Sequence, residues 1–126
     1  VRRRLGQGSF KMQVVDAYGR ACAVTKEHSL PVLEAAHIRP YAQHGTHEVH
    51  NGVLLRSDIH RLFDRGYVTI DPDYKFRVSE QLREHWRNGK VYYDLADHAI
   101  SVPSDDELRP QRELLEWHRD EVFLDA

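Results

Sequence analysis

Apolar residues at helical spacing open the chain. Phe10, Val14 and Tyr18 recur every four residues and define one face of a helix. Ser9 is the expected N-cap, because Gly6-Gln7-Gly8 just before it are expected to interrupt regular structure. We therefore predict a first helix that starts after these glycines and packs its apolar face into the core.

Two short apolar runs then enclose a polar loop. Residues 31–38 predict a strand, residues 39–50 predict a loop, and residues 53–55 predict a second strand. A helix of about two turns is expected next, capped by Ser57 and ended by Gly66. The predicted order in this region is strand, loop, strand and helix.

The second half of the chain predicts a hairpin and further helices. Residues 67–70 and 75–78 alternate in the manner of strands around Asp71-Pro72-Asp73. Ser79 is expected to cap a helix that reaches Trp86. Residues 91–102 give a weaker pattern with one short strand near their end, and an amphipathic helix follows Pro110. The mixture predicts an α+β fold.

Length and composition limit the class of protein. The 126 residues suit a single domain that builds its own core. The one cysteine, Cys22, excludes an internal disulfide and the paired-cysteine zinc ribbons, and is expected to be a small buried residue. Neither a signal peptide nor a membrane span is visible, which favours a cytoplasmic protein. Because the chain begins with Val1 rather than Met, we expect it to be part of a longer protein.

The charge distribution is uneven although the net charge is only −2. Residues 1–93 carry 15 Lys and Arg against 10 Asp and Glu, whereas residues 94–126 carry 3 against 10. Arginine outnumbers lysine, 14 to 4, and its planar guanidinium suits phosphate. This pattern favours a nucleic-acid face in the first part of the chain, and ordinary surface charge is the alternative.

A histidine and an asparagine flank the predicted loop. His37 ends the first strand, where a neutral imidazole can accept a proton from water near pH 7. If the two strands pair antiparallel, the amide of Asn51 comes close enough to orient the His37 ring. The alternatives are a structural histidine and a simple Asn-Gly turn. His44, His47 and His50 crowd the loop and are expected to be solvated, to contact phosphate or to bind an extra metal.

His60 and Asp64 are four residues apart on the predicted helix, and so share one face. An imidazole and a carboxylate can bind Mg²⁺, Mn²⁺, Zn²⁺ or Ni²⁺, with open positions left for water and phosphate. An exposed surface pair is the alternative. Arg56, Arg61 and Arg65 flank this helix and Arg39 follows His37, so we assign these four arginines to nucleic-acid binding.

These residues together resemble the ββα-metal motif of the HNH endonucleases, also called the His-Me finger. The matching segments are His37-Ile38, then Asn51-Gly52-Val53-Leu54-Leu55, and then the His60-to-Gly66 segment HRLFDRG. The resemblance implies a ββα core at residues 32–66, with flanking helices and a β-hairpin, within a single nuclease domain of residues 1–126.

The resemblance also implies roles for individual residues. His37 matches the general base, Asn51 the residue that orients it, and His60 a catalytic residue that binds the metal. Asp64 falls where related nucleases place another ligand. Ala36 stands where many members have an Asp or His ligand, so Glu34 and Asp58 are candidates for a third ligand.

The implied activity is hydrolysis of phosphodiester bonds in DNA, expected to be double-stranded, with one divalent ion, Mg²⁺ or Mn²⁺ ahead of Zn²⁺ or Ni²⁺. The family occurs as the cutting module of restriction and other anti-phage defence proteins, in which a domain of the same or a partner chain selects the target. Cutting both strands would favour a homodimer. Two rivals remain: an inactive nucleic-acid-binding module with the same fold, and a domain whose histidines bind metal only for stability.

Overall fold

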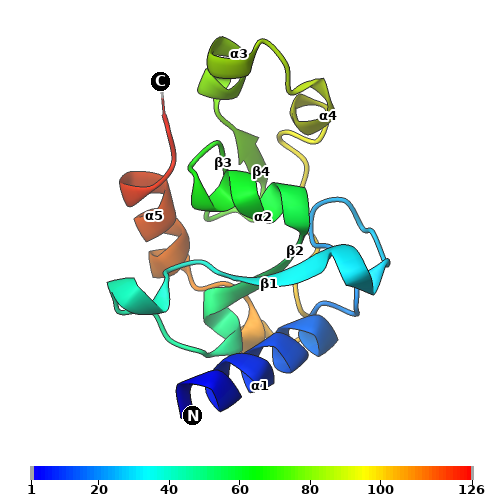
Figure 1. Cartoon of the computed structure of the whole chain (residues 1–126), viewed down its shortest axis with the longest axis vertical. Coiled ribbons are helices and arrows are strands. Elements are labelled where there is room, and N and C mark those ends of the chain that lie inside the picture. The colour runs from blue at the N-terminus through cyan, green and yellow to red at the C-terminus, as the bar shows by residue number, and fades with distance from the viewer. Residues whose placement is uncertain (1, 126) are drawn as a thin grey trace.

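A strand pair between two helices forms the centre of the molecule. The computed structural model describes residues 2–125, with side chains from Ser9 onward. Strands β1 (Leu33–His37) and β2 (Gly52–Arg56) pair antiparallel, with His37 opposite Gly52. Helix α1 (Arg2–Ala17) packs on one side of this pair and α2 (Ser57–Asp64) on the other (Figure 1). The α+β class and the strand–loop–strand–helix order predicted from the sequence are confirmed.

Helix α1 starts earlier than predicted. It runs without a break from Arg2 through residues 6–8, so Ser9 lies inside the helix and is not its N-cap. Glycine in a helix interior costs about 1 kcal/mol relative to alanine, which weakens a helix without ending it. Phe10 and Val14 are buried as predicted, and both approach Gly52 closely. A Cβ on Gly52 would lie 2.7 Å from the Phe10 ring, so glycine is required for this approach.

The second half of the chain follows the predicted order more closely. Strands β3 (Val68–Ile70) and β4 (Phe76–Val78) form the expected hairpin. Ser79 caps α3 (Glu80–Trp86) by accepting a hydrogen bond from the backbone of Gln81. Ser57, in contrast, is not a cap, because Arg56 occupies the N-cap position of α2.

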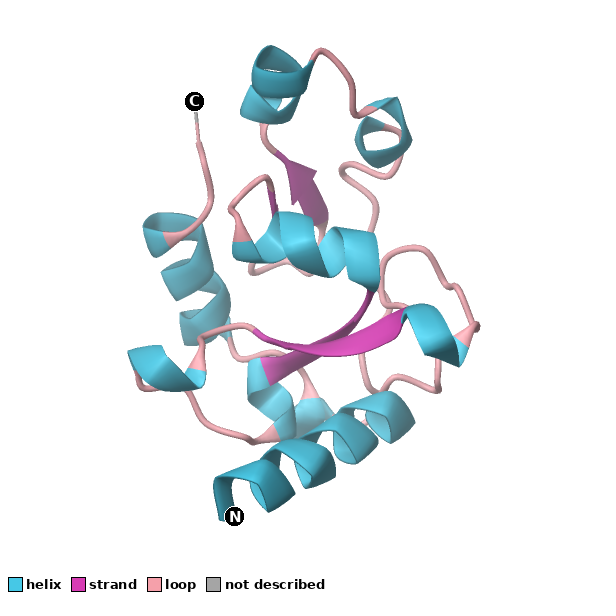
Figure 2. Ribbon diagram, viewed as in Figure 1, coloured by secondary structure: helices cyan, strands magenta, loops and turns pink. Residues whose placement is uncertain are grey.

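The region 91–102 differs from its prediction. It begins within the short helix α4 (Lys90–Tyr93), and the expected strand near its end is reduced to one bridge between Lys75 and Ala99. Helix α5 (Arg112–Glu121) follows Pro110 as expected and packs against β3 (Figure 2). Within residues 2–125 there are also four short 3₁₀ turns, at Leu30–Val32, Tyr41–Gln43, Val49–Asn51 and Asp106–Leu108.

Strand β2 is the centre of the core. Val53, Leu54 and Leu55 are all 0% exposed, because α1 and α2 cover its two faces. Such a strand reads as a continuous apolar run, which is why residues 53–55 were predictable. Cys22 is buried beside β2 with a free thiol, as expected. Among residues 2–125, no helix is long and apolar enough to cross a membrane.

Candidate active site

Three of the predicted site residues line one pocket. His37 at the end of β1, and His60 and Asp64 on α2, border a pocket of about 450 Å³. The antiparallel pairing of β1 with β2 places the end of β1 beside the helix that follows β2. The i, i+4 spacing then turns His60 and Asp64 toward the same side. The structure therefore brings together the candidate base and the candidate metal ligands.

His37 is held between aromatic rings. Phe10 stacks on its imidazole with ring centroids 4.0 Å apart and planes 10° apart. Nε2 of His37 lies 3.0 Å from Nδ1 of His47, which comes from the loop between β1 and β2. Burial, followed by the nearby imidazoles of His47 and His60, lowers the pKa of His37 below its usual 6.5. This shift favours the neutral form of His37, which is the form that a general base needs.

Asn51 does not orient His37 in the way the sequence suggested. Its side chain is 1% exposed, and its Oδ1 accepts a 2.9 Å hydrogen bond from the backbone N–H of Arg39. Its Nδ2 donates to the backbone oxygens of Arg39 and Thr46, at 2.9 and 2.8 Å. Both amide protons are thus used by the loop that follows His37. Asn51 fixes the loop, and any effect on His37 passes through that loop.

His60 lies between two carboxylates. Its Nε2 is 3.2 Å from Oδ2 of Asp64, and its Nδ1 is 2.8 Å from Oε1 of Glu34 on β1. The bond to Asp64, and then the bond to Glu34, raise the pKa of His60 above 6.5 despite partial burial. Without a metal ion, His60 is therefore stabilised in its protonated form.

The donor set at His60 fits a divalent ion with two protein ligands. Two ligand atoms about 2.1 Å from an ion and at a right angle lie about 3 Å apart, close to the 3.2 Å between His60 Nε2 and Asp64 Oδ2. Glu34 contacts the opposite ring nitrogen, so it is placed to orient His60 and not to share its ion. Ala36, at the position where a ligand was expected from the resemblance, is 0% exposed in the core and has no side-chain donor atom. Within residues 2–125, no group of three His, Cys, Asp or Glu side chains gathers as a metal cluster.

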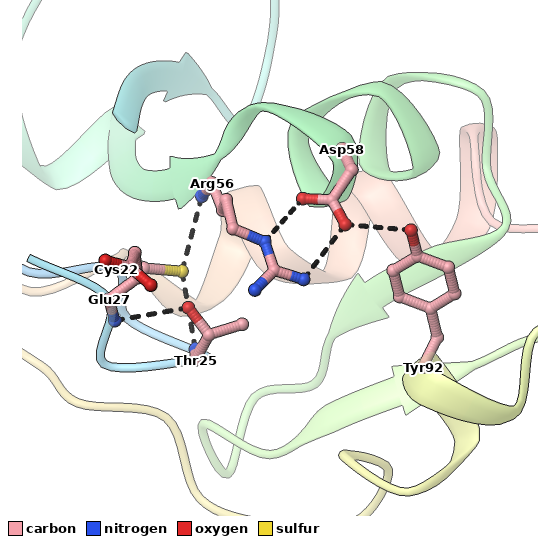
Figure 3. Close-up of polar contacts among 6 residues, drawn as sticks. All are labelled: Cys22, Thr25, Glu27, Arg56, Asp58 and Tyr92. Carbon is pink, nitrogen blue, oxygen red and sulfur yellow. Dashed lines mark hydrogen bonds and ion pairs between the residues drawn. The ribbon is translucent and has the colours of Figure 1, made fainter. Parts of the chain in front are cut away.

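Asp58 is not placed as a third ligand. It lies two positions before His60, on the opposite face of α2. Its carboxylate accepts hydrogen bonds of 2.7 and 3.0 Å from Arg56 and one of 2.8 Å from the Tyr92 hydroxyl (Figure 3). The Arg56 guanidinium, helped by Tyr92, lowers the pKa of Asp58 to about 2. Asp58 is therefore an ionised structural partner, and its assignment to the metal is corrected.

The four candidate arginines differ in their surroundings. The Arg56 side chain is occupied by Asp58, and its backbone N–H donates to Sγ of Cys22 (Figure 3). Arg39 lies over the Trp117 ring, 5.2 Å from its centroid, and donates to the backbone oxygen of Gln43. Arg61 and Arg65 are exposed, the first on α2 and the second just after it. The surroundings of Arg61 and Arg65 best suit a phosphate contact, and Arg56 is better described as structural.

Two histidines had no usable sequence signal: His118, which lines the pocket, and His47, which contacts His37. His118 is 1% exposed, and its Nε2–H donates to the Phe63 carbonyl at 2.8 Å while its Nδ1 accepts from the Thr69 hydroxyl at 2.7 Å. Burial lowers its pKa to about 4, so it is a neutral structural residue that ties α5 to α2 and β3. His47 was grouped with the other loop histidines, and only the folded loop shows that it reaches His37.

Comparison with known proteins agrees with this geometry. Residues 22–71, which include β1, the loop, β2 and α2, match the family model described as HNH endonuclease. The resemblance drawn from the sequence is thus confirmed over this HNH segment.

The fold is also similar to that of a solved structure, a modification-dependent TagI restriction endonuclease. The TM-score is 0.62 at 20% identity, and the match covers 90% of this chain and 37% of that chain. The present chain therefore spans little more than a third of the length of that enzyme. The comparison with curated proteins gave no match.

Proposed function

We propose that the chain is the cleavage domain of a metal-dependent endonuclease that hydrolyses phosphodiester bonds in DNA. The observation that carries the proposal is the single pocket shared by His37, His60 and Asp64. One histidine there favours its neutral form, and the other lies beside a carboxylate at a separation that suits an ion. The HNH match and the likeness in fold to a restriction endonuclease support the same activity.

In this proposal His37 is the general base. Water that attacks the phosphorus atom must lose a proton, and a neutral imidazole with a pKa below 6.5 is free to accept it at pH 7. Phe10 limits the tilt of the ring from one face. Ring orientation matters because a general base must lie within hydrogen-bond reach of the proton that it removes.

His60 and Asp64 would hold the divalent ion, through Nε2 and a carboxylate oxygen. When bound, such an ion stabilises the extra negative charge of the transition state and the departing oxygen. Mg²⁺ and Mn²⁺ are the ions we favour, with Zn²⁺ and Ni²⁺ as alternatives. Glu34 would accept a hydrogen bond from Nδ1–H of His60, which fixes the ring and leaves Nε2 for the ion.

The expected substrate is double-stranded DNA, with Arg61 and Arg65 on backbone phosphates. Such contacts give affinity and position without reading sequence. Target selection would then belong to another domain, of this protein or of a partner, which fits the 37% of the restriction endonuclease that this chain covers. A restriction or other anti-phage role, and dimerisation for cutting both strands, are part of this proposal.

A plasmid-nicking assay tests the proposal. We expect the wild-type chain to nick supercoiled DNA with Mg²⁺ or Mn²⁺ and not with EDTA. His37→Ala should lose about 10²- to 10⁴-fold of this activity, the range for removal of a general base. His44→Asn, a change at an exposed loop residue with φ of +72°, is the matched control and should cut like wild type. Equal cutting by His37→Ala would contradict the proposal.

The inactive DNA-binding module remains the second candidate, because Ala36 supplies no ligand. This candidate predicts that the chain binds DNA in a gel-shift assay. In the plasmid-nicking assay, cleavage would stay at the level of the EDTA control whichever divalent ion is added. Loss of the folded state in His60→Ala or Asp64→Ala would instead favour a metal that serves stability.

A further inference from the structure

The imidazole of His37 is held by a second imidazole. Nε2 of His37 and Nδ1 of His47 are 3.0 Å apart, a hydrogen-bond distance. Between two imidazoles such a contact needs one proton, so one nitrogen donates and the other accepts. Since Nε2 of His37 is engaged in this way, Nδ1 is the nitrogen left for proton transfer.

Hydrogen bonds and a close backbone approach hold the part of the loop that precedes His47. Its neighbour Thr46 accepts a hydrogen bond from the buried Asn51 amide. Gly45 passes so close to the chain that a Cβ there would lie 1.8 Å from the Arg39 carbonyl oxygen, and its N–H donates to Pro40. These contacts fix the residues on the N-terminal side of His47 against both ends of the loop.

Ring contacts complete the support of His47. Tyr41 stacks on its imidazole, with centroids 4.8 Å apart and planes 6° apart. His47 in turn meets the edge of His37 at a centroid distance of 5.1 Å. Nε2 of His47 is buried and bonds to no group among the described residues. Among the described residues, His37 is therefore the hydrogen-bond partner of the His47 ring.

We propose that His47 is the positioning residue for His37, because its Nδ1 accepts the Nε2–H of His37 when His37 takes a proton from the attacking water. This inference rests on the proposed function. The proton from water goes to Nδ1 of His37, which then carries N–H on both nitrogens and donates from Nε2 to the unprotonated Nδ1 of His47. Such a charge-assisted bond is stronger than the neutral one, so its contribution grows as the proton is transferred. Asn51 acts one step further away, through the loop that carries His47.

Two variants separate the role of the His47 nitrogen from that of its ring, and a third is their control. His47→Phe keeps an aromatic ring between Tyr41 and His37 and removes the nitrogens. His47→Asn places an amide oxygen near the position of Nδ1 and removes the ring. His44→Asn is the control for a change elsewhere in the loop. We expect His47→Phe to lower the single-turnover cutting rate about 10- to 100-fold with DNA affinity unchanged, and His47→Asn to restore part of the rate.

A measurement that needs no cleavage tests the contact itself. In ¹⁵N-labelled protein, a coupling through the hydrogen bond should join His37 Nε2 to His47 Nδ1, and it should vanish in His47→Phe. Absence of this coupling in the wild type overturns the inference. If the wild type cuts and His47→Phe cuts equally fast, only the role of His47 is wrong. If the wild type cuts no DNA with any divalent ion, the proposed function fails and this role fails with it.

Discussion

His37 and His60 line the same pocket from different elements, yet their surroundings favour opposite protonation states. His37 is at the end of a strand, between a phenylalanine ring and another histidine, and burial lowers its pKa. His60 is on a helix between two carboxylates, and hydrogen bonds raise its pKa. Two like side chains whose environments move their pKa values apart indicate a division of acid–base roles. One is suited to accept a proton, and the other to exchange its proton for a metal ion.

The largest expected effect separates these roles by metal concentration. His37→Gln should cut about 10²- to 10⁴-fold more slowly at every metal concentration, because the base is gone. His60→Gln should also cut slowly, but its deficit should shrink as Mg²⁺ or Mn²⁺ is raised, since Asp64 still offers one ligand. Single-turnover plasmid nicking over a range of metal concentrations measures both. If raising the metal concentration restored the cutting rates of the two variants equally, the assignment of different roles to His37 and His60 would be wrong.

A smaller effect is expected at Glu34, which contacts His60 on the side away from Asp64. Glu34→Gln should weaken binding of the divalent ion about 10- to 100-fold, the usual cost of losing a carboxylate that orients a ligating histidine. Isothermal titration calorimetry with Mn²⁺ measures this directly.

Asp58→Asn is the control for Glu34→Gln, because Asp58 lies on the opposite face of α2 in its contact with Arg56 and Tyr92. It should leave the affinity for Mn²⁺ unchanged. Binding weakened as much by this variant as by Glu34→Gln would restore Asp58 as a ligand.

The smallest effect is expected at the exposed arginines near the end of α2. Replacing Arg61 and Arg65 by alanine should weaken DNA binding and reduce its salt dependence by about one unit of slope per lost phosphate contact. The cutting rate of fully bound DNA should stay near that of wild type. Arg112→Ala, an exposed arginine paired with Glu116 on α5, should change neither quantity. Equal salt slopes in the double variant and the wild type would exclude these phosphate contacts.

Much of the fold and the pairing of His60 with Asp64 could be predicted from local sequence patterns. The apolar run 53–55, the hairpin around Asp71-Pro72-Asp73 and the Ser79 cap all act over a few residues. The i, i+4 spacing of His60 and Asp64 is likewise local.

The contacts that could not be predicted join distant or irregular segments. Glu34 meets His60 across 26 positions, and Asn51 bonds the Arg39 backbone across 12. The contact of His47 with His37 depends on a loop path that no periodicity describes. The helical conformation through Gly6-Gln7-Gly8 was also not predicted, because local propensity there favours a break.

An NMR titration of the histidine side chains tests the division of roles most directly. In the metal-free protein, we predict that His37 loses its proton below pH 6.5 and His60 above it. Mg²⁺ or Zn²⁺ should then remove the proton from His60 and leave the neutral ring of His37 in place, so that metal affinity rises with pH through the His60 pKa. A His37 pKa above that of His60, or a metal ion that binds at His37, would contradict the account.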